Sequence, residues 1–100
     1  MKTSQTLSLE TVITHAPGVF RAELDGTLLL AAQYGGQGHC LDPVGLVIWE
    51  ALVEPCSIAS LCDLLSERYE VEKTVCENDV LTFISELLDK KMVMIVLSNS

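Results

Sequence analysis

The sequence predicts an α+β fold, in which a three-stranded antiparallel sheet is followed by three helices and a possible short C-terminal strand. Apolar residues alternate with polar ones within residues 19–41, as in strands, and recur at helical spacing within residues 42–91. The chain has 100 residues, of which 49% are hydrophobic and 5% aromatic, so it suits one domain with a mainly aliphatic core. We expect residues 1–16 to be a partly loose N-terminal segment and residues 17–97 to form that domain.

The first two strands are predicted to form a hairpin. Val19–Leu24 alternates between apolar and polar residues, and Thr27–Ala32 returns after Asp25-Gly26. Type I′ hairpin turns favour this dipeptide because glycine tolerates a positive φ. A loop with three glycines then leads to a short third strand at about residues 37–41.

From Asp42 onward the spacing of apolar residues is helical. Asp42 is a favourable N-cap, and Pro43 follows at the first helical position, where its missing N–H costs nothing. Ser57 is the expected N-cap of a second helix. A third helix begins near Thr74 and Glu77, which have the spacing of a capping box.

The third helix carries the longest apolar stripe of the chain, formed by Val80, Phe83, Ile84, Leu87 and Leu88. After this helix, residues 92–97 are all apolar and predict the final strand. In the first helix, Trp49 is expected to pack in the core, since a single large aromatic residue among aliphatic ones usually fills volume.

The charge of the chain argues against nucleic acid and membrane partners. Six Lys and Arg stand against fourteen Asp and Glu, which gives a formal net charge of -8. Affinity for nucleic acid depends on basic residues that neutralise phosphates, and an anionic membrane surface repels an acidic protein. A neutral or basic partner is expected. Because the sequence has no stretch of signal-peptide length and none that could span a bilayer, we expect a cytoplasmic protein.

The residues do not assemble a catalytic or metal site, so we expect a protein without enzymatic activity or cofactor. None of the common nucleotide, hydrolase or metalloprotease motifs is present. His39 and Cys40 are neighbours on a strand and point to opposite faces, so they cannot form a nucleophile and its base. The histidines His15 and His39 are far apart, and the cysteines form no C-x-x-C pair that would bind zinc.

Three motifs, in this order after the hairpin and the short third strand, resemble a known family. They are G-x-x-I-W-E at residues 45–50, Y-E-V at residues 69–71, and C-x-x-D-V-L-x-F-I-x-x-L at residues 76–87. This pattern is similar to the PqqD-like peptide chaperones, also called recognition elements of ribosomally synthesised and post-translationally modified peptides (RiPPs). The resemblance covers residues 17–96 and is greatest for the stand-alone members of lasso-peptide biosynthesis clusters.

The resemblance implies a winged helix-turn-helix-like fold that binds the leader segment of a ribosomally made precursor peptide instead of DNA. In such proteins the leader adds as a further strand to the third strand, and its side chains enter the cleft between that strand and the third helix. The bound leader is presented to a processing enzyme, which is a leader protease, with a cyclase acting afterwards, in lasso-peptide maturation. The sequence departs from the family at His39, where an aromatic residue is frequent, and at Lys91-Met92, where many members have a glycine.

This implied binding mode defines the candidate peptide-binding residues. Asp79 is included because it adjoins the apolar stripe of the third helix, although a solvated carboxylate is the alternative interpretation. Phe83, Ile84 and Leu87 could equally belong to the core. The third strand itself contains neither Lys nor Pro, the residues that commonly protect an exposed edge. The full set is Tyr34, Gln37, Gly38, His39, Cys40, Leu41, Asp79, Val80, Phe83, Ile84 and Leu87.

A DNA-binding winged-helix regulator is the alternative function, since the order of strands and helices would be the same. A recognition helix for DNA presents Lys and Arg to phosphates and bases. The second helix offers only Arg68, and the third has Lys73 and Lys90-Lys91 at its two ends among several acids. A further alternative is a subunit that only stabilises an enzyme and does not bind an isolated leader peptide.

Overall fold

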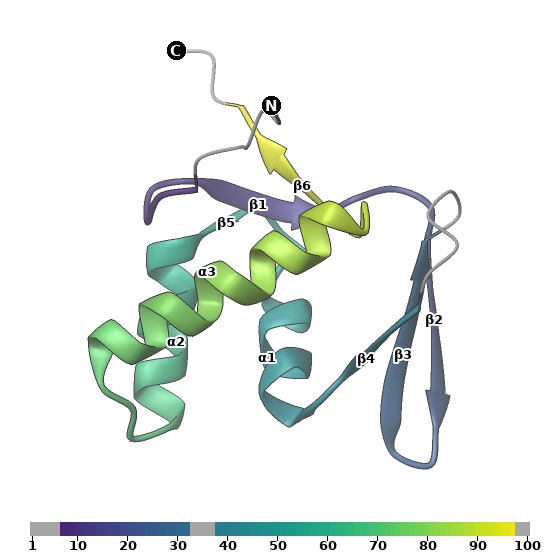
Figure 1. The fold of residues 1–100 in the computed structure, drawn as a ribbon, viewed down its shortest axis with the longest axis horizontal. Helices are drawn as coiled ribbons and strands as arrows, with labels where there is room; N and C mark the ends of the chain where they lie inside the picture. Colours follow the sequence, from purple (N-terminus) through teal and green to yellow (C-terminus); the bar gives the residue numbers. More distant parts are fainter. Residues whose placement is uncertain (1–6, 33–37, 98–100) are drawn as a thin grey trace.

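Two three-stranded antiparallel sheets and three helices make up the fold (Figure 1). The computed structural model describes residues 7–32 and 38–97. The predicted α+β class is confirmed, including the order of a sheet followed by helices. The second sheet is the feature that the sequence analysis did not anticipate.

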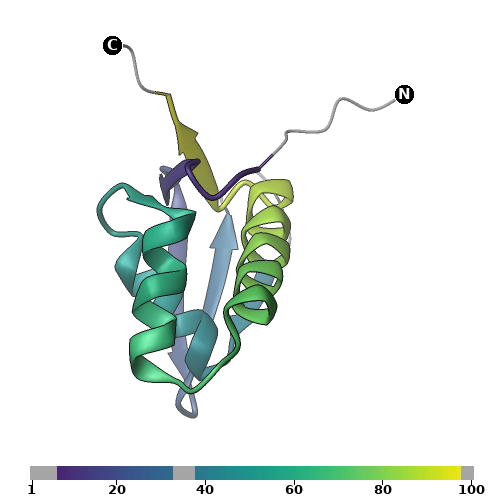
Figure 2. The same ribbon diagram turned by 90° about the vertical axis from the view of Figure 1, so that its left-hand side faces the viewer.

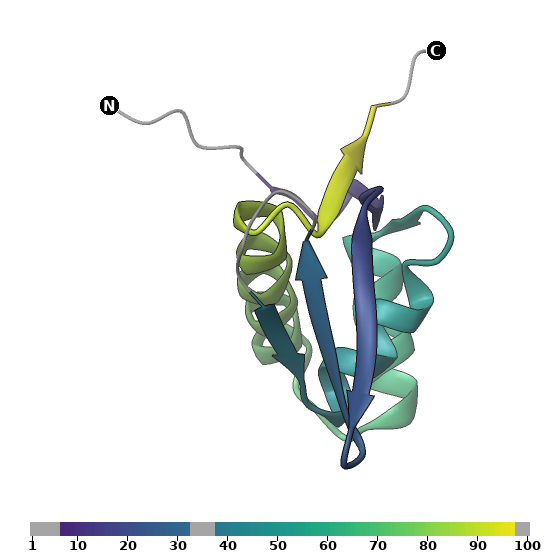
Figure 3. The same cartoon turned by 90° about the vertical axis from the view of Figure 1, so that its right-hand side faces the viewer.

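The first sheet contains β2 (Val19–Leu24), β3 (Thr27–Ala32) and β4 (Gly38–Leu41), in the spatial order β2-β3-β4. Asp25 and Gly26 have φ values of 54° and 79°, as a type I′ turn requires, and the predicted hairpin is therefore confirmed. Figure 3 shows the helices behind this sheet, so that one face of the sheet covers the core.

The second sheet joins distant parts of the chain. β1 (Val12–His15) lies between β5 (Cys56–Ser57) and β6 (Val93–Val96). The final strand is thus confirmed. The domain predicted from the sequence begins at residue 17, whereas β1 precedes that position and its Ile13 is fully buried. Short strands of weak alternation such as β1 are recognisable only when their partners, here from the opposite end of the chain, are known.

The first two helices begin at the predicted N-caps. α1 (Pro43–Ala51) follows Asp42, whose side-chain carboxylate accepts a 2.6 Å hydrogen bond from the N–H of Gly45. α2 (Ile58–Arg68) follows Ser57, whose hydroxyl oxygen accepts a 3.1 Å bond from the N–H of Ser60. Each cap satisfies one of the N–H groups that the first turn of a helix leaves without a partner.

The third helix begins earlier than predicted. α3 (Lys73–Asp89) has Glu72 at its N-cap position and no side-chain capping bond there. The capping box that the sequence analysis placed at Thr74 and Glu77 is therefore wrong, because Thr74 is already inside the first turn. Val71 packs against the core just before the helix, and this contact directs the chain into α3 before Thr74 is reached.

One aliphatic core lies between the helices and the two sheets. Trp49 is 3% exposed and its ring stacks on His15 with 3.6 Å between ring centroids, which confirms its predicted core position. Figure 2 shows the helices α2 and α3 side by side. Cys62 of α2 and Cys76 of α3 are both buried, and the Cys76 thiol lies 3.9 Å from the Cys62 carbonyl oxygen. Burial raises the pKa of Cys62 to about 11, with Cys76 adding to the effect. Among the described helices, none is both long and apolar enough to cross a membrane.

The end of α3 offers a test of the backbone geometry. Lys91 follows the last helical turn with φ 61°, a left-handed conformation that favours glycine. We expect Lys91→Gly to raise the free energy of unfolding by about 0.5–1 kcal/mol, because only glycine avoids the Cβ clash at this φ. Urea denaturation measures the change. Lys91→Ala keeps the strained φ and is the control; an equal gain in both variants would refute this explanation.

Candidate functional site

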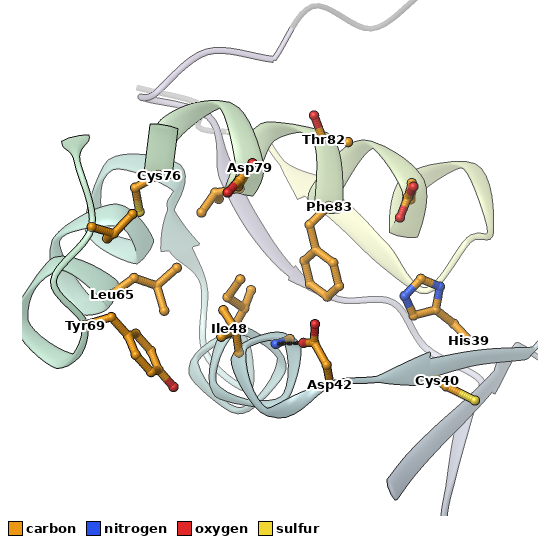
Figure 4. A pocket seen from close by; sticks show the side chains of 15 residues that line it. His39, Cys40, Asp42, Ile48, Leu65, Tyr69, Cys76, Asp79, Thr82 and Phe83 are labelled. Carbon is orange, nitrogen blue, oxygen red and sulfur yellow. Dashed lines mark hydrogen bonds between the residues drawn. The ribbon is translucent and has the colours of Figure 1, made fainter. Parts of the chain in front are cut away.

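A groove of about 600 Å³ lies beside β4. Figure 4 shows it bounded by α3 on one side, by β4 and the start of α1 on the other, and by the end of α2 at one extremity. Its side chains are mostly apolar, with carboxylates at the margin. The lining residues run from Tyr69 at the end of α2 to His39 on β4 (Figure 4). Such an apolar surface suits an extended peptide segment better than a small polar molecule.

The wall from α3 combines two adjacent stripes of that helix. Val80 belongs to the core stripe and is 1% exposed. Asp79, Thr82, Phe83 and Glu86 follow at helical spacing on the neighbouring stripe and also line the groove. Residues three, four and seven apart lie on one side of a helix, which is why this stripe forms a continuous wall. Phe83 is its aromatic centre (Figure 4).

The floor of the groove comes from the first turns of α1. Gly45 and Ile48 line it, and the Asp42 cap holds the first turn in place. A Cβ atom on Gly45 would lie 3.3 Å from Cε1 of Phe83 and 3.1 Å from Oδ1 of Asp42. Both contacts are tighter than normal packing, so the glycine allows the Phe83 ring to rest directly against α1.

The far end of the groove is formed by Leu65, Tyr69 and Val71. Leu65 is buried, whereas the Tyr69 side chain at the end of α2 borders the groove and is 36% exposed. These residues were not among the predicted site residues, although Tyr69 and Val71 belong to one of the motifs that carried the family resemblance. The motif is the signal that could have identified Tyr69 and Val71.

The turn of the hairpin determines which backbone N–H and C=O groups of β4 point toward β3 and which point to its open edge. In a type I′ turn the carbonyl of the first residue, here Leu24, accepts a hydrogen bond from the N–H of the fourth, Thr27. Hydrogen-bonded and non-hydrogen-bonded pairs alternate along antiparallel strands. In β3, therefore, every second residue after Thr27 bonds toward β2, and Leu28 and Leu30 direct their N–H and C=O groups toward β4.

On β4, the partners of these two leucines are Leu41 and His39. Their backbone groups therefore bond to β3, while the N–H and C=O groups of Gly38 and Cys40 point to the opposite edge. The position of Lys90 agrees, because its Nζ approaches the Gly38 carbonyl oxygen from that edge at 3.4 Å. Within residues 7–32 and 38–97, β4 pairs with β3 alone, so this edge is open to a further strand.

His39 occupies the end of the groove nearest the edge. Its ring lies edge-on to Phe83, with 5.8 Å between centroids, and its Nδ1 is 2.9 Å from Nζ of Lys90. Burial lowers the pKa of His39, and the Lys90 charge lowers it further, against the opposing carboxylates of Glu86 and Asp42. An ammonium can only donate, so Nδ1 is the acceptor and the imidazole is neutral with its proton on Nε2.

The structure brings together five of the predicted site residues and separates the others. His39, Cys40, Asp79, Val80 and Phe83 line the groove, while the Cys40 side chain points away from it (Figure 4).

Three further predicted residues, Leu41, Ile84 and Leu87, are buried in the core beneath the groove, with exposed fractions of 4%, 0% and 0%. Their side chains support the walls and do not reach the groove, because they lie on the inward faces of β4 and α3. Gly38 lies on the open edge. Tyr34 and Gln37 are outside the described residues.

The described residues of the groove offer apolar side chains and carboxylates that could contact a ligand. His39 and Cys40 point to opposite sides of β4, as expected for neighbours on a strand. Among residues 7–32 and 38–97, no three His, Cys, Asp or Glu side chains are grouped so that they could hold a metal ion.

Comparisons with known proteins agree with this architecture. Residues 10–93 match the family described as coenzyme PQQ synthesis protein D (PqqD). A solved structure described as lasso peptide synthetase B1 complexed with the leader peptide has a TM-score of 0.71 and 24% identity, and the match covers 82% of this chain and 96% of the other. The structure of TbiB1 in complex with the TbiA(beta) leader peptide has a TM-score of 0.73 and 25% identity, over 85% and 99% of the two chains. No curated protein gives a significant match.

The contact between His39 and Lys90 should affect the pKa of the His39 imidazole. We expect Lys90→Met to raise the pKa of His39 part of the way to the ordinary value, because the repelling charge is removed while burial remains. An NMR titration of the imidazole resonances measures this pKa. Lys91→Met removes the same charge from the exposed neighbouring residue and is the control. Equal pKa values in the wild type and the Lys90 variant would show that the contact does not form in solution.

Proposed function

Since this chain belongs to the PqqD family, we propose that it is a non-catalytic module that captures the leader segment of a ribosomally synthesised precursor peptide. The observation that carries the proposal is the open β4 edge, where the N–H and C=O of Cys40 point outward beside an apolar groove. The names of the two similar structures, which both hold leader peptides, support the same ligand class.

Binding by strand addition uses the main chain for attraction. An extended leader segment placed along β4 can exchange two hydrogen bonds with Cys40, because both of its outward backbone groups are presented together. These bonds form with any sequence other than one with proline at that position. The main chain therefore supplies affinity and alignment but little selection.

Selection comes from the side chains on one face of the added strand. Alternate residues of a strand point to the same side, so every second leader residue faces the groove. The Phe83 ring and the Tyr69 end of the groove provide apolar contacts, and a large apolar leader side chain between them would bury surface worth about 1.5–3 kcal/mol. Asp79 and Glu86 at the margin favour a leader without acidic residues next to this anchor.

The proposal places the protein upstream of a separate processing enzyme. A leader held along one edge leaves the remainder of the precursor free to enter another active site. In a lasso-peptide pathway that enzyme would be a leader protease, followed by a cyclase. The alternative DNA-binding function is not favoured, because α3 exposes the carboxylates of Asp79, Glu86 and Asp89 and has basic residues only near its ends.

Cys40→Pro tests the proposed edge. Proline removes the outward N–H of Cys40 without removing a bond to β3, so we expect at least a tenfold loss of leader affinity in a protein that remains folded. The probe is a fluorescein-labelled synthetic peptide spanning the leader half of the precursor encoded beside this protein, titrated by fluorescence polarisation.

Cys40→Ala is the matched control, because it removes the thiol and keeps the N–H. It should bind like the wild type, since the thiol points away from the groove. Unchanged affinity in a folded Cys40→Pro variant would rule out strand addition at this edge.

Gly45→Ala tests the groove. The added methyl group would approach Phe83 at 3.3 Å and displace its ring toward the ligand space. We expect a several-fold loss of leader affinity, with a change in the free energy of unfolding of no more than about 1 kcal/mol, because alanine also favours the helix. Parallel polarisation and denaturation experiments separate the two effects. A loss of stability without a loss of affinity would show that the groove floor does not contact the peptide.

A further inference from the structure

The side chain of Lys90 is held at one end of the β4 edge by the way α3 terminates. Lys90 is the C-cap residue of α3, and its N–H donates to the Glu86 carbonyl. The chain then turns at Lys91, with φ 61°, and Met92 is fully buried. A hydrogen bond of 2.9 Å from the Met92 N–H to the Leu87 carbonyl secures the turn. The backbone of Lys90 is thereby fixed next to β4, although 51 positions separate it from His39.

Two acceptors on β4 receive the Lys90 ammonium. His39 Nδ1 lies at 2.9 Å and the Gly38 carbonyl oxygen at 3.4 Å. His39 is itself held by its edge-on contact with Phe83, so the nearer acceptor has a defined position. Burial and the Lys90 charge lower the pKa of His39, which favours the neutral imidazole that can accept this hydrogen bond. Glu86 and Asp42 are the acidic groups that oppose this effect.

The ammonium occupies the place that a ligand N–H would need. Gly38 and Cys40 are the two described β4 residues with outward backbone groups, and a strand added along both would donate one N–H to each carbonyl. At Gly38 the Lys90 ammonium already approaches from the open side. Lysine is a residue that proteins use to protect sheet edges. Here it comes from a helix and not from the strand, which is why the sequence of β4 did not reveal it.

We infer that Lys90 caps the β4 edge at Gly38 and restricts strand addition to the Cys40 position, with His39 as the residue that positions the ammonium. This inference rests on the proposed function. It makes Lys90 a determinant of register and specificity, because it leaves Cys40 as the described β4 residue whose two outward backbone groups are free to pair, and a leader gains further affinity from side chains in the groove. Peptides that are merely extended are thereby rejected.

An amide-to-ester scan of the synthetic leader peptide tests the inference, because each ester removes one N–H while adding no bulk. In the wild type we expect esters to weaken binding at the residue that donates to the Cys40 carbonyl and not at the residue that would donate to Gly38. In Lys90→Met we expect a second sensitive position two residues away, with a loss of about three- to tenfold, typical of one hydrogen bond. The two-residue spacing holds for either strand direction.

Lys91→Met is the matched control and should reproduce the wild-type scan, since it removes an equal charge beside Lys90. Sedimentation at the same concentration establishes that each variant is in the same oligomeric state. Identical sensitive positions in the wild type and Lys90→Met would overturn the inference and leave the proposed function intact. Weaker binding of every peptide to Lys90→Met would also overturn it, because Lys90 would then be a ligand contact. Binding of no peptide to any variant would refute the proposed function and, with it, this inference.

Discussion

The type I′ turn at Asp25-Gly26 sets the hydrogen-bonding alternation of the β2-β3-β4 sheet, and the character of the site depends on it. Because the turn pairs Leu24 with Thr27, the backbone groups of successive β3 residues bond alternately to β2 and to β4. On the next strand, β4, this alternation leaves the backbone N–H and C=O groups of Cys40 pointing outward.

A few local contacts place the walls and floor of the groove beside the same β4 edge. Asp42 ends β4 and caps α1, so the strand passes directly into the helix that forms the floor. Gly45 lets Phe83 of α3 lie against that floor. The second sheet contributes at a distance, since β6 continues from α3 and pairs with β1, which anchors the helix end from which Lys90 extends. Short-range contacts thus bring together the β4 edge, the floor from α1 and the wall from α3.

Negative and positive side chains lie at different places along the groove. Carboxylates of Asp79 and Glu86 border the wall, while the ammonium of Lys90 lies at the Gly38 end, where the neutral His39 accepts from it. A protein with a net charge of -8 therefore presents a cation at the end of its open edge. This arrangement covers the Gly38 end of the edge and leaves the Cys40 groups beside the apolar surface, where side-chain selection can act.

Much of the fold was determined by local sequence signals. The D-G turn, the caps at Asp42 and Ser57 and the helical stripes act over a few residues, so they are readable without a structure, and the motif order was sufficient to indicate the family. The start of α3 was misassigned because contacts of Val71 with the core outweigh the capping pattern at Thr74. The division of α3 residues between groove and core, with Phe83 in the wall and Ile84 and Leu87 beneath it, was decided only by the tertiary structure. Helical spacing brings all three to one side, and the neighbouring elements determine which of them remain accessible. The pairing of β1 with β5 and the contact of Lys90 with β4 likewise join residues 43 or more positions apart, and no local pattern encodes such pairings.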